Sequence, residues 1–353
     1  MRPVKILVIR RDNIGDLVLT LPLIRAIRER FPDGWIAALV NTYNAPVLEG
    51  SPWLDAVYAY QKFKHAGPAS LPATAVRDVR LVMALRAQAV DYAVLAGSGL
   101  LPRALRLARF CGARHIVGFV PSGQPCGAID VPVEFGSAAG LHEVQDVFRL
   151  GRAFGIEGEA PAAFLQPNAA VVSEIHDRLR AKLGGAHGPT VGVHISARKP
   201  SQRWPVERFV AFMRAMKDAG TARFLLFWSP GAADHRQHPG DDAKASELLE
   251  ALRDFPVIAC ETRRLTELVA GLSLCDRVVC SDGGAMHIAA ALGKPILCFF
   301  GNSPAERFHP WGVPYVLLQP PSLEVRDISA EQAIEGFERL QDLTRGAQAQ
   351  ASS

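Results

Sequence analysis

The sequence predicts an α/β protein made of two doubly wound domains. The chain has 353 residues, which is long for a single domain. Short runs rich in Val, Ile and Leu recur along it, and a longer stretch of helical period follows each run. Because strands and helices alternate in both halves, we expect two parallel sheets, each covered by helices on both faces.

In the first half, the apolar runs indicate five strands separated by helices. The strands are expected at Lys5–Arg10, Trp35–Asn41, Val57–Tyr60, Tyr92–Gly97 and His115–Val120, and the helices at about Leu17–Phe31, Ala75–Val90 and Leu100–Cys111. The segment Pro121–Gly140 is rich in Gly, Pro and Ser, so it is interpreted as a long loop.

The second half repeats the alternation. Its strands are expected at Thr190–Ser196, Arg223–Ser229, Val257–Cys260, Arg277–Ser281, Pro295–Phe300 and Tyr315–Gln319, and its helices at about Val206–Ala219, Asp242–Arg253, Leu265–Cys275, Ala285–Leu292 and Ala330–Leu343. A boundary within Glu157–Asn168 gives domains of residues 1–160 and 168–345. The small polar residues after Thr344 are expected to fray.

The composition fits ordinary globular cores, with 49% hydrophobic and 21% charged residues. A net charge of +4 is far from that of a dedicated nucleic-acid binder, so no nucleic-acid partner is predicted. The charge suits an enzyme of phosphorylated substrates, or one that rests against an anionic membrane. From charge alone, we favour the plainer interpretation of a solvated surface with a few extra arginines.

Cysteine usage and apolar patterning predict a cytoplasmic protein. None of the six cysteines forms a CxxC pair, and several lie in apolar runs, so neither zinc nor iron ligation is predicted. The first apolar run is too short for a signal-peptide core, and no stretch approaches the about 18–20 apolar residues of a spanning helix. Any contact with the inner face of the inner membrane is therefore expected to be peripheral.

The loop after the first strand is the first candidate site, because ligands bind parallel sheets at the carboxyl ends of strands. Gly15 permits a tight turn, and Asp16 stands where the next helix is expected to begin. Asp16 could simply cap this helix, and an aspartate there could also act as a base. Arg10 and Arg11 could hold an anionic acceptor or lie in solvent.

Two further loops follow strands of the second half. Arg198, Lys199 and Arg203 place three cations between a strand and a helix, which suits a diphosphate site or a solvated basic loop. Asp282-Gly283-Gly284 then turns into a helix whose N–H groups could meet phosphate oxygens. His287 lies one turn into that helix and could face the same ligand.

These loops carry a resemblance to a known family. Residues 9–32, IRRDNIGDLVLTLPLIRAIRERFP, resemble the N-terminal signature of the family-9 glycosyltransferases, which include the lipopolysaccharide heptosyltransferases. In that family the aspartate of the Gly-Asp pair is the proposed general base, and it corresponds to Asp16. The turn and helix at 282–293, DGGAMHIAAALG, resemble the donor-site motif, so Asp282, Gly283, Gly284 and His287 are expected to bind the donor.

The second loop matches the family with one departure. Ser196 and the Trp204-Pro205 pair fit its pattern, whereas Gln202 stands where relatives carry a phosphate-binding lysine. The resemblance therefore implies that Lys199 or Arg203 supplies the charge, and we favour Arg203. Asp234 is the nearest candidate for the family's ribose-binding acidic residue, and it matches poorly.

The resemblance implies two Rossmann-like domains facing a central cleft, the GT-B-type architecture. It also implies transfer of a heptose from ADP-heptose to an inner-core lipopolysaccharide acceptor, with inversion and without a metal or cofactor. Alternatives are a transferase or epimerase of another nucleotide sugar and a non-catalytic sugar-nucleotide binder. No G-x-G-x-x-G follows a predicted strand and no P-loop motif is present, which disfavours a dehydrogenase and an NTPase.

Overall fold

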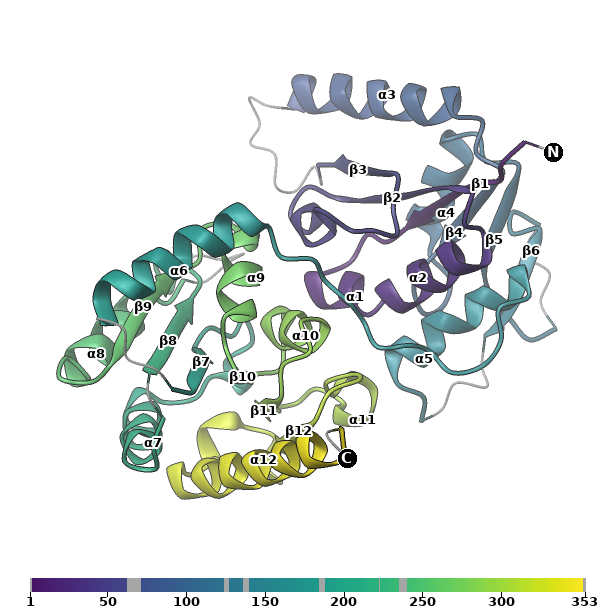
Figure 1. The fold of residues 1–353 in the computed structure, drawn as a ribbon. Coiled ribbons are helices and arrows are strands. Elements are labelled where there is room, and N and C mark those ends of the chain that lie inside the picture. Colours follow the sequence, from purple (N-terminus) through teal and green to yellow (C-terminus); the bar gives the residue numbers. More distant parts are fainter. Residues whose placement is uncertain are drawn as a thin grey trace. The chain divides into compact units, whose positions relative to one another are not determined.

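The computed structural model of the chain divides into two units, Met1–Gln166 and Pro167–Ser353 (Figure 1). It describes residues 2–61, 71–123, 127–135, 140–183, 188–221, 223–234 and 240–351. Within these ranges each unit holds a six-stranded parallel sheet with helices on both faces. The predicted fold class, α/β with two Rossmann-like domains, is confirmed.

The N-terminal sheet has the strand order β3-β2-β1-β4-β5-β6. Its strands are β1 (Lys5–Ile9), β2 (Trp35–Asn41), β3 (Ala56–Tyr60), β4 (Tyr92–Leu95), β5 (His115–Pro121) and β6 (Val131–Phe135). The helices are α1 (Ile14–Val18), α2 (Leu21–Arg30), α3 (Leu71–Ala87), α4 (Pro102–Phe110) and α5 (Glu143–Phe148). α3 and α4 pack on one face of the sheet in a single apolar cluster, and α1, α2 and α5 lie on the other (Figure 1).

The C-terminal sheet has the order β12-β11-β10-β7-β8-β9. Its strands are β7 (Thr190–His194), β8 (Arg223–Trp228), β9 (Val257–Glu261), β10 (Arg277–Ser281), β11 (Ile296–Phe299) and β12 (Tyr315–Leu318). The helices are α6 (Ala169–Leu183), α7 (Val206–Asp218), α8 (Asp242–Ala251), α9 (Leu265–Ser273), α10 (Gly284–Ala291), α11 (Ala305–Phe308) and α12 (Ala330–Ala351). α7, α8 and α12 share one core with the sheet, centred on Trp204, Phe212 and Phe337.

Three sequence predictions differ from the structure. The segment interpreted as a loop contains β6, an edge strand that pairs with β5; Pro132 is tolerated there because an edge strand leaves one side unpaired. The first predicted helix breaks into α1 and α2 around Leu19–Thr20. The C-terminal tail continues α12 to Ala351 instead of fraying after Thr344.

Two expectations drawn from composition can be compared with the described residues. Within these ranges, none of the helices combines the length and the apolar character that a membrane crossing needs. Cys111, Cys260, Cys275, Cys280 and Cys298 are buried and unbridged, as expected of cysteines in apolar runs. Cys126 lies outside the described residues.

Both sheets share a topology that fixes where a ligand can bind. Counted from its own first strand, each sheet runs 3-2-1-4-5-6. The chain therefore leaves the first and fourth strands in opposite directions, which opens a crevice at their carboxyl ends. In the N-terminal domain this switch point lies between β1 and β4, and in the C-terminal domain between β7 and β10.

Candidate active site

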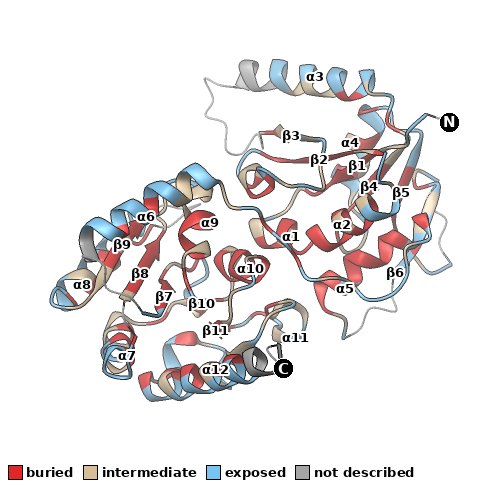
Figure 2. Ribbon diagram, in the orientation of Figure 1, coloured by how far each residue is buried: buried red, intermediate tan, exposed pale blue. Residues whose placement is uncertain are grey.

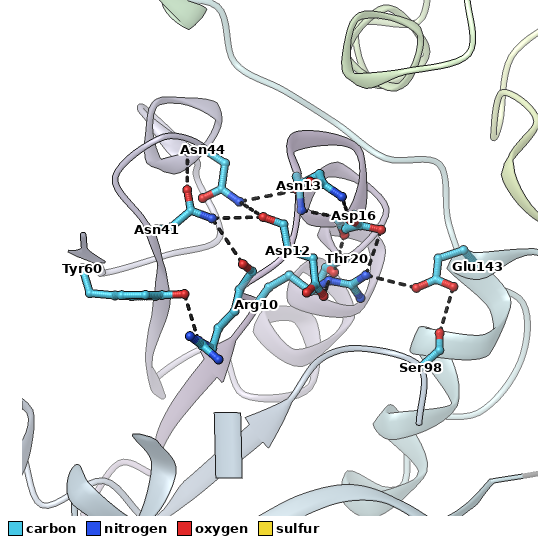
Figure 3. Close-up of polar contacts among 11 residues, drawn as sticks. Arg10, Asp12, Asn13, Asp16, Thr20, Asn41, Asn44, Tyr60, Ser98 and Glu143 are labelled. Atoms are coloured by element: carbon cyan, nitrogen blue, oxygen red, sulfur yellow. Dashed lines mark hydrogen bonds and ion pairs between the residues drawn. The ribbon is translucent and has the colours of Figure 1, made fainter. Parts of the chain in front are cut away.

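The switch point of the N-terminal domain is built around the buried guanidinium of Arg10. Its side chain is 3% exposed and touches three carboxylates (Figure 3). Nε lies 3.2 Å from an oxygen of Asp12, and Nη2 lies 3.2 Å from Asp16 and 3.1 Å from Glu143. A charge removed from water needs such partners, so the buried arginine draws three carboxylates together at this point.

Both carboxylate oxygens of Asp16 have polar partners, but the side chain remains partly exposed. Oδ1 faces Arg10, while Oδ2 accepts hydrogen bonds from the backbone N–H of Asn13 at 2.9 Å and from its amide at 3.0 Å. The N-cap of α1 is Asn13, so the interpretation of Asp16 as the N-cap is wrong: it is the third helical residue and reaches back to the cap. Its side chain is 20% exposed, which leaves an orientated carboxylate within reach of a ligand.

Glu143, the first residue of α5, was not anticipated from the sequence. It is buried, and its second oxygen accepts a 2.8 Å hydrogen bond from Ser98 in the loop after β4. A Cβ on the neighbouring Gly97 would lie 2.9 Å from Leu101 Cδ1 and 3.5 Å from Arg10 Nη1, so this loop passes close beside the Arg10 side chain. Because Glu143 lies 133 residues from Arg10, no local pattern could have indicated the pair.

The two arginines predicted to bind the acceptor differ in their surroundings. Arg10 is enclosed by carboxylates, whereas Arg11 is half-buried, donates from Nε to the Tyr60 hydroxyl at 2.8 Å and stacks on that ring at 5.2 Å. Asn41 braces the same loop by donating to the Asp12 carbonyl at 3.0 Å. The acceptor-binding role of both arginines stays a prediction.

In the C-terminal domain, the loops after β7, β10 and β11 meet at a buried glutamine. Nε2 of Gln202, a residue that is 4% exposed, donates to Asp282 at 2.6 Å and to the Ser303 hydroxyl at 2.9 Å. The exposed Lys199 donates to the same hydroxyl at 3.2 Å. Two of the predicted donor residues, Lys199 and Asp282, are thus brought together through Gln202 and Ser303.

The other predicted donor residues shape the same switch point. Ser196 accepts a 2.9 Å hydrogen bond from the Ser229 amide, and Arg203 donates from Nε to the Ala197 carbonyl at 3.1 Å. Gly283 is the N-cap of α10, and a Cβ built on it would meet no atom within 4 Å, so the space beside the turn is open. His287 is buried one turn into α10.

Lys244 on α8 links the two ends of the loop that follows β7, which we call the donor loop (residues 195–205). This lysine was also not anticipated. Its ammonium donates to the carbonyls of Ile195 at 3.1 Å and Trp204 at 2.8 Å, which are the two ends of the loop. Burial lowers the Lys244 pKa to about 8. Burial, together with the nearby Lys244 charge, lowers the pKa of His194 to about 4. A cavity of about 370 Å³ opens here, lined by Arg203, Trp204 and Lys244.

Comparison with known proteins identifies the family of the chain. The family model described as glycosyltransferase family 9 (heptosyltransferase) matches residues 79–333. Lipopolysaccharide heptosyltransferase 2 of Escherichia coli K12 is 25% identical over 85% of this chain and 83% of its own length. Lipopolysaccharide heptosyltransferase 1 of the same strain is 21% identical over 95% of this chain and all of its own.

Solved structures show the same fold. The E. coli ADP-heptose lipopolysaccharide heptosyltransferase II superposes with a TM-score of 0.75 at 19% identity, covering 97% of this chain and 100% of that one. A family-9 glycosyl transferase from Veillonella parvula superposes with a TM-score of 0.78 at 17% identity, covering 96% and 98%. The fold is that of a two-domain glycosyltransferase of the GT-B type. The chain belongs to glycosyltransferase family 9, and it is similar to the lipopolysaccharide heptosyltransferases.

The lowered His194 pKa predicts a pH-dependent stability. Between pH 6.5 and about 4, the unfolded chain takes up a proton that folded His194 does not, so the free energy of unfolding falls as the pH falls. The loss reaches at most about 3 kcal/mol. His194→Gln should flatten this dependence in calorimetric melting between pH 7 and 5, whereas His176→Gln, at an exposed histidine of α6, should not. Equal slopes for wild type and His194→Gln would contradict the prediction.

Proposed function

We propose that this glycosyltransferase moves a heptose from ADP-heptose to an inner-core lipopolysaccharide acceptor, with Asp16 as the general base. The observation that carries the proposal is the partly exposed Asp16 carboxylate, held by Arg10 and Asn13 at the switch point of the N-terminal domain. Its relatives at 21–25% identity carry heptosyltransferase names, which supports the substrate class.

In the proposed step, Asp16 takes the proton from the acceptor hydroxyl while that oxygen attacks the anomeric carbon. The bond from this carbon to the diphosphate oxygen breaks, and its electron pair leaves with ADP. Attack opposite the leaving group inverts the anomeric configuration. Positioned bases of this kind contribute about 10²–10⁴-fold to the rate.

Arg10 and Glu143 act in this proposal as positioning residues. Arg10 shares its guanidinium between Asp16, Asp12 and Glu143, so it fixes the direction of the base without meeting the reacting atoms. Glu143 in turn links Arg10 to Ser98 after β4. A base fixed to a fraction of an ångström raises the share of encounters that react.

The leaving diphosphate is assigned to the C-terminal switch point. Lys199, Arg203, the Gly283–Gly284 turn and the N-terminus of α10 offer cations and backbone N–H groups beside open space. Such pre-orientated donors stabilise the charge that develops on a leaving group. Ser196 and His287 complete the proposed donor site.

The role of Asp16 is tested by Asp16→Asn. The amide keeps the size of the side chain but cannot accept the proton, so turnover of ADP-heptose and acceptor should fall by roughly 10²-fold or more. ADP affinity by titration calorimetry should stay unchanged. Asp12→Asn is the matched control, since Asp12 touches the same arginine at 3.2 Å. A larger loss for the control would transfer the base role to Asp12.

Donor choice is tested by thermal shift. ADP should stabilise the protein more than UDP, GDP or NAD, because the proposed donor is an ADP-sugar. At 100 times its Kd, a ligand adds about 2.7 kcal/mol to the free energy of unfolding. Equal shifts for all four nucleotides, or a shift with NAD alone, would rule out the heptosyltransferase proposal.

Three variants test which cation of the donor loop binds the diphosphate, with the Kd of ADP measured by titration calorimetry. Arg203→Ala should weaken binding by roughly ten- to a hundredfold, because a charge-assisted hydrogen bond contributes about 1.5–3 kcal/mol. Lys199→Ala should do much less. Gln202→Lys should tighten binding, because it keeps donors for Asp282 and Ser303 and adds a cation. Three unchanged Kd values would show that this loop does not bind the diphosphate, so that only the turn before α10 could bind it.

A further inference from the structure

The outward face of α3 carries an unusual stripe of exposed apolar side chains. Val76, Val79 and Met83 are 53%, 59% and 65% exposed. Their spacing of three and then four residues puts them in one line along the helix. Leu85 belongs to the core cluster and Leu81 packs against it, so the stripe is additional to the face that holds the helix in place. Figure 2 shows exposed turns along much of the described part of α3.

Arginines lie on both sides of this stripe. At 100° per residue, Arg77 and Arg80 fall on one side of it and Arg86 on the other, and all three are exposed. The single acidic residue of α3, Asp78, turns inward: its Oδ1 is buried, and desolvation raises its pKa. The outer surface of α3 therefore combines apolar side chains with positive charge only.

α4 extends the same surface. It lies beside α3 on the same face of the sheet, with Ala104 and Ala108 in the cluster that contains Leu85. Its exposed side carries Phe110, which is 58% exposed, together with three arginines. These are Arg103, Arg106 and Arg109.

Charge is concentrated on this pair of helices. α3 and α4 hold six arginines against one aspartate, whereas the whole chain has a net charge of only +4. Within the described residues, none of the six arginines forms an ion pair. Folded surfaces normally mix both signs, so an unpaired basic face around an apolar stripe indicates a binding surface.

We propose that the α3–α4 face docks on an anionic lipid bilayer. An apolar stripe flanked by arginines is the pattern of a helix that lies in the membrane interface. Val76, Val79, Met83 and Phe110 would enter the headgroup region, and the guanidinium groups would pair with lipid phosphates. A second copy of this face is a poor occupant because like charges would oppose each other. Phe110 is the single aromatic residue of α3 and α4, whereas a nucleic-acid surface offers several aromatic platforms for stacked bases.

The proposal goes beyond the transfer reaction and does not rest on it, because docking is measured without any sugar substrate. Sedimentation of the full chain with phosphatidylglycerol–phosphatidylethanolamine vesicles should show binding that weakens in high salt, and pure phosphatidylcholine vesicles should bind far less. Each arginine near an anionic surface contributes about 1 kcal/mol, so Arg80→Gln, Arg103→Gln and Arg106→Gln together should reduce partitioning about a hundredfold.

Matched controls lie in the C-terminal domain. Arg253→Gln, Arg326→Gln and Arg345→Gln remove the same charge from exposed arginines and should leave partitioning nearly unchanged. Val79→Asn with Met83→Asn should reduce partitioning at high and low salt alike, whereas Leu343→Asn, at a leucine of α12 that is 52% exposed, should not. Unchanged melting temperatures confirm that the variants fold.

Three outcomes would overturn the proposal. The first is equal partitioning to anionic and zwitterionic vesicles. The second is an equal loss for the α3–α4 variants and the C-terminal controls. The third is a change from dimer to monomer in Val79→Asn/Met83→Asn without loss of vesicle binding, which would make the face a contact between copies of this chain.

Discussion

The buried charge of Arg10 is the constraint on which the N-terminal domain's site depends. A guanidinium that is 3% exposed would be very costly without partners, so the surrounding elements must deliver carboxylates to it. They come from the loop after β1, from the first turn of α1 and from α5. The same pairing that makes Arg10 tolerable inside the protein also fixes Asp16, so stability and the orientation of the proposed base have one physical origin.

At the C-terminal switch point, a neutral side chain rather than a cation links the polar groups of the loops. Gln202 links Asp282 and Ser303 through one amide nitrogen, where the family pattern places a lysine. A neutral donor satisfies the Asp282 carboxylate without neutralising it, which leaves the cations Lys199 and Arg203 at the edge of the loop. Lys244 holds the two ends of the loop from behind, so the loop is braced independently of any ligand.

The sequence predicted most of the fold because parallel strands carry a local signal. Trp35–Asn41 and Arg277–Ser281 were predicted to the residue, since buried strands appear as continuous apolar runs. β6 was missed because its short, exposed edge carries little of that signal. Glu143 and Lys244 were missed for another reason. Glu143 pairs with an arginine 133 residues away, and Lys244 donates to two backbone carbonyls. Neither kind of contact leaves a spacing pattern in the sequence.

Net charge illustrates the same limit. A value of +4 favoured a solvated surface with a few extra arginines, because a total cannot say where charges lie. The fold separates them: one arginine, Arg10, is enclosed by three carboxylates at the switch point, while the six arginines of α3 and α4 stand together on one face of the sheet. Once those six and Asp78 are set aside, the rest of the chain is close to neutral. The net positive charge of the chain is therefore carried by one face, and a charged face can orient a molecule against a charged surface in a way that a uniform charge cannot.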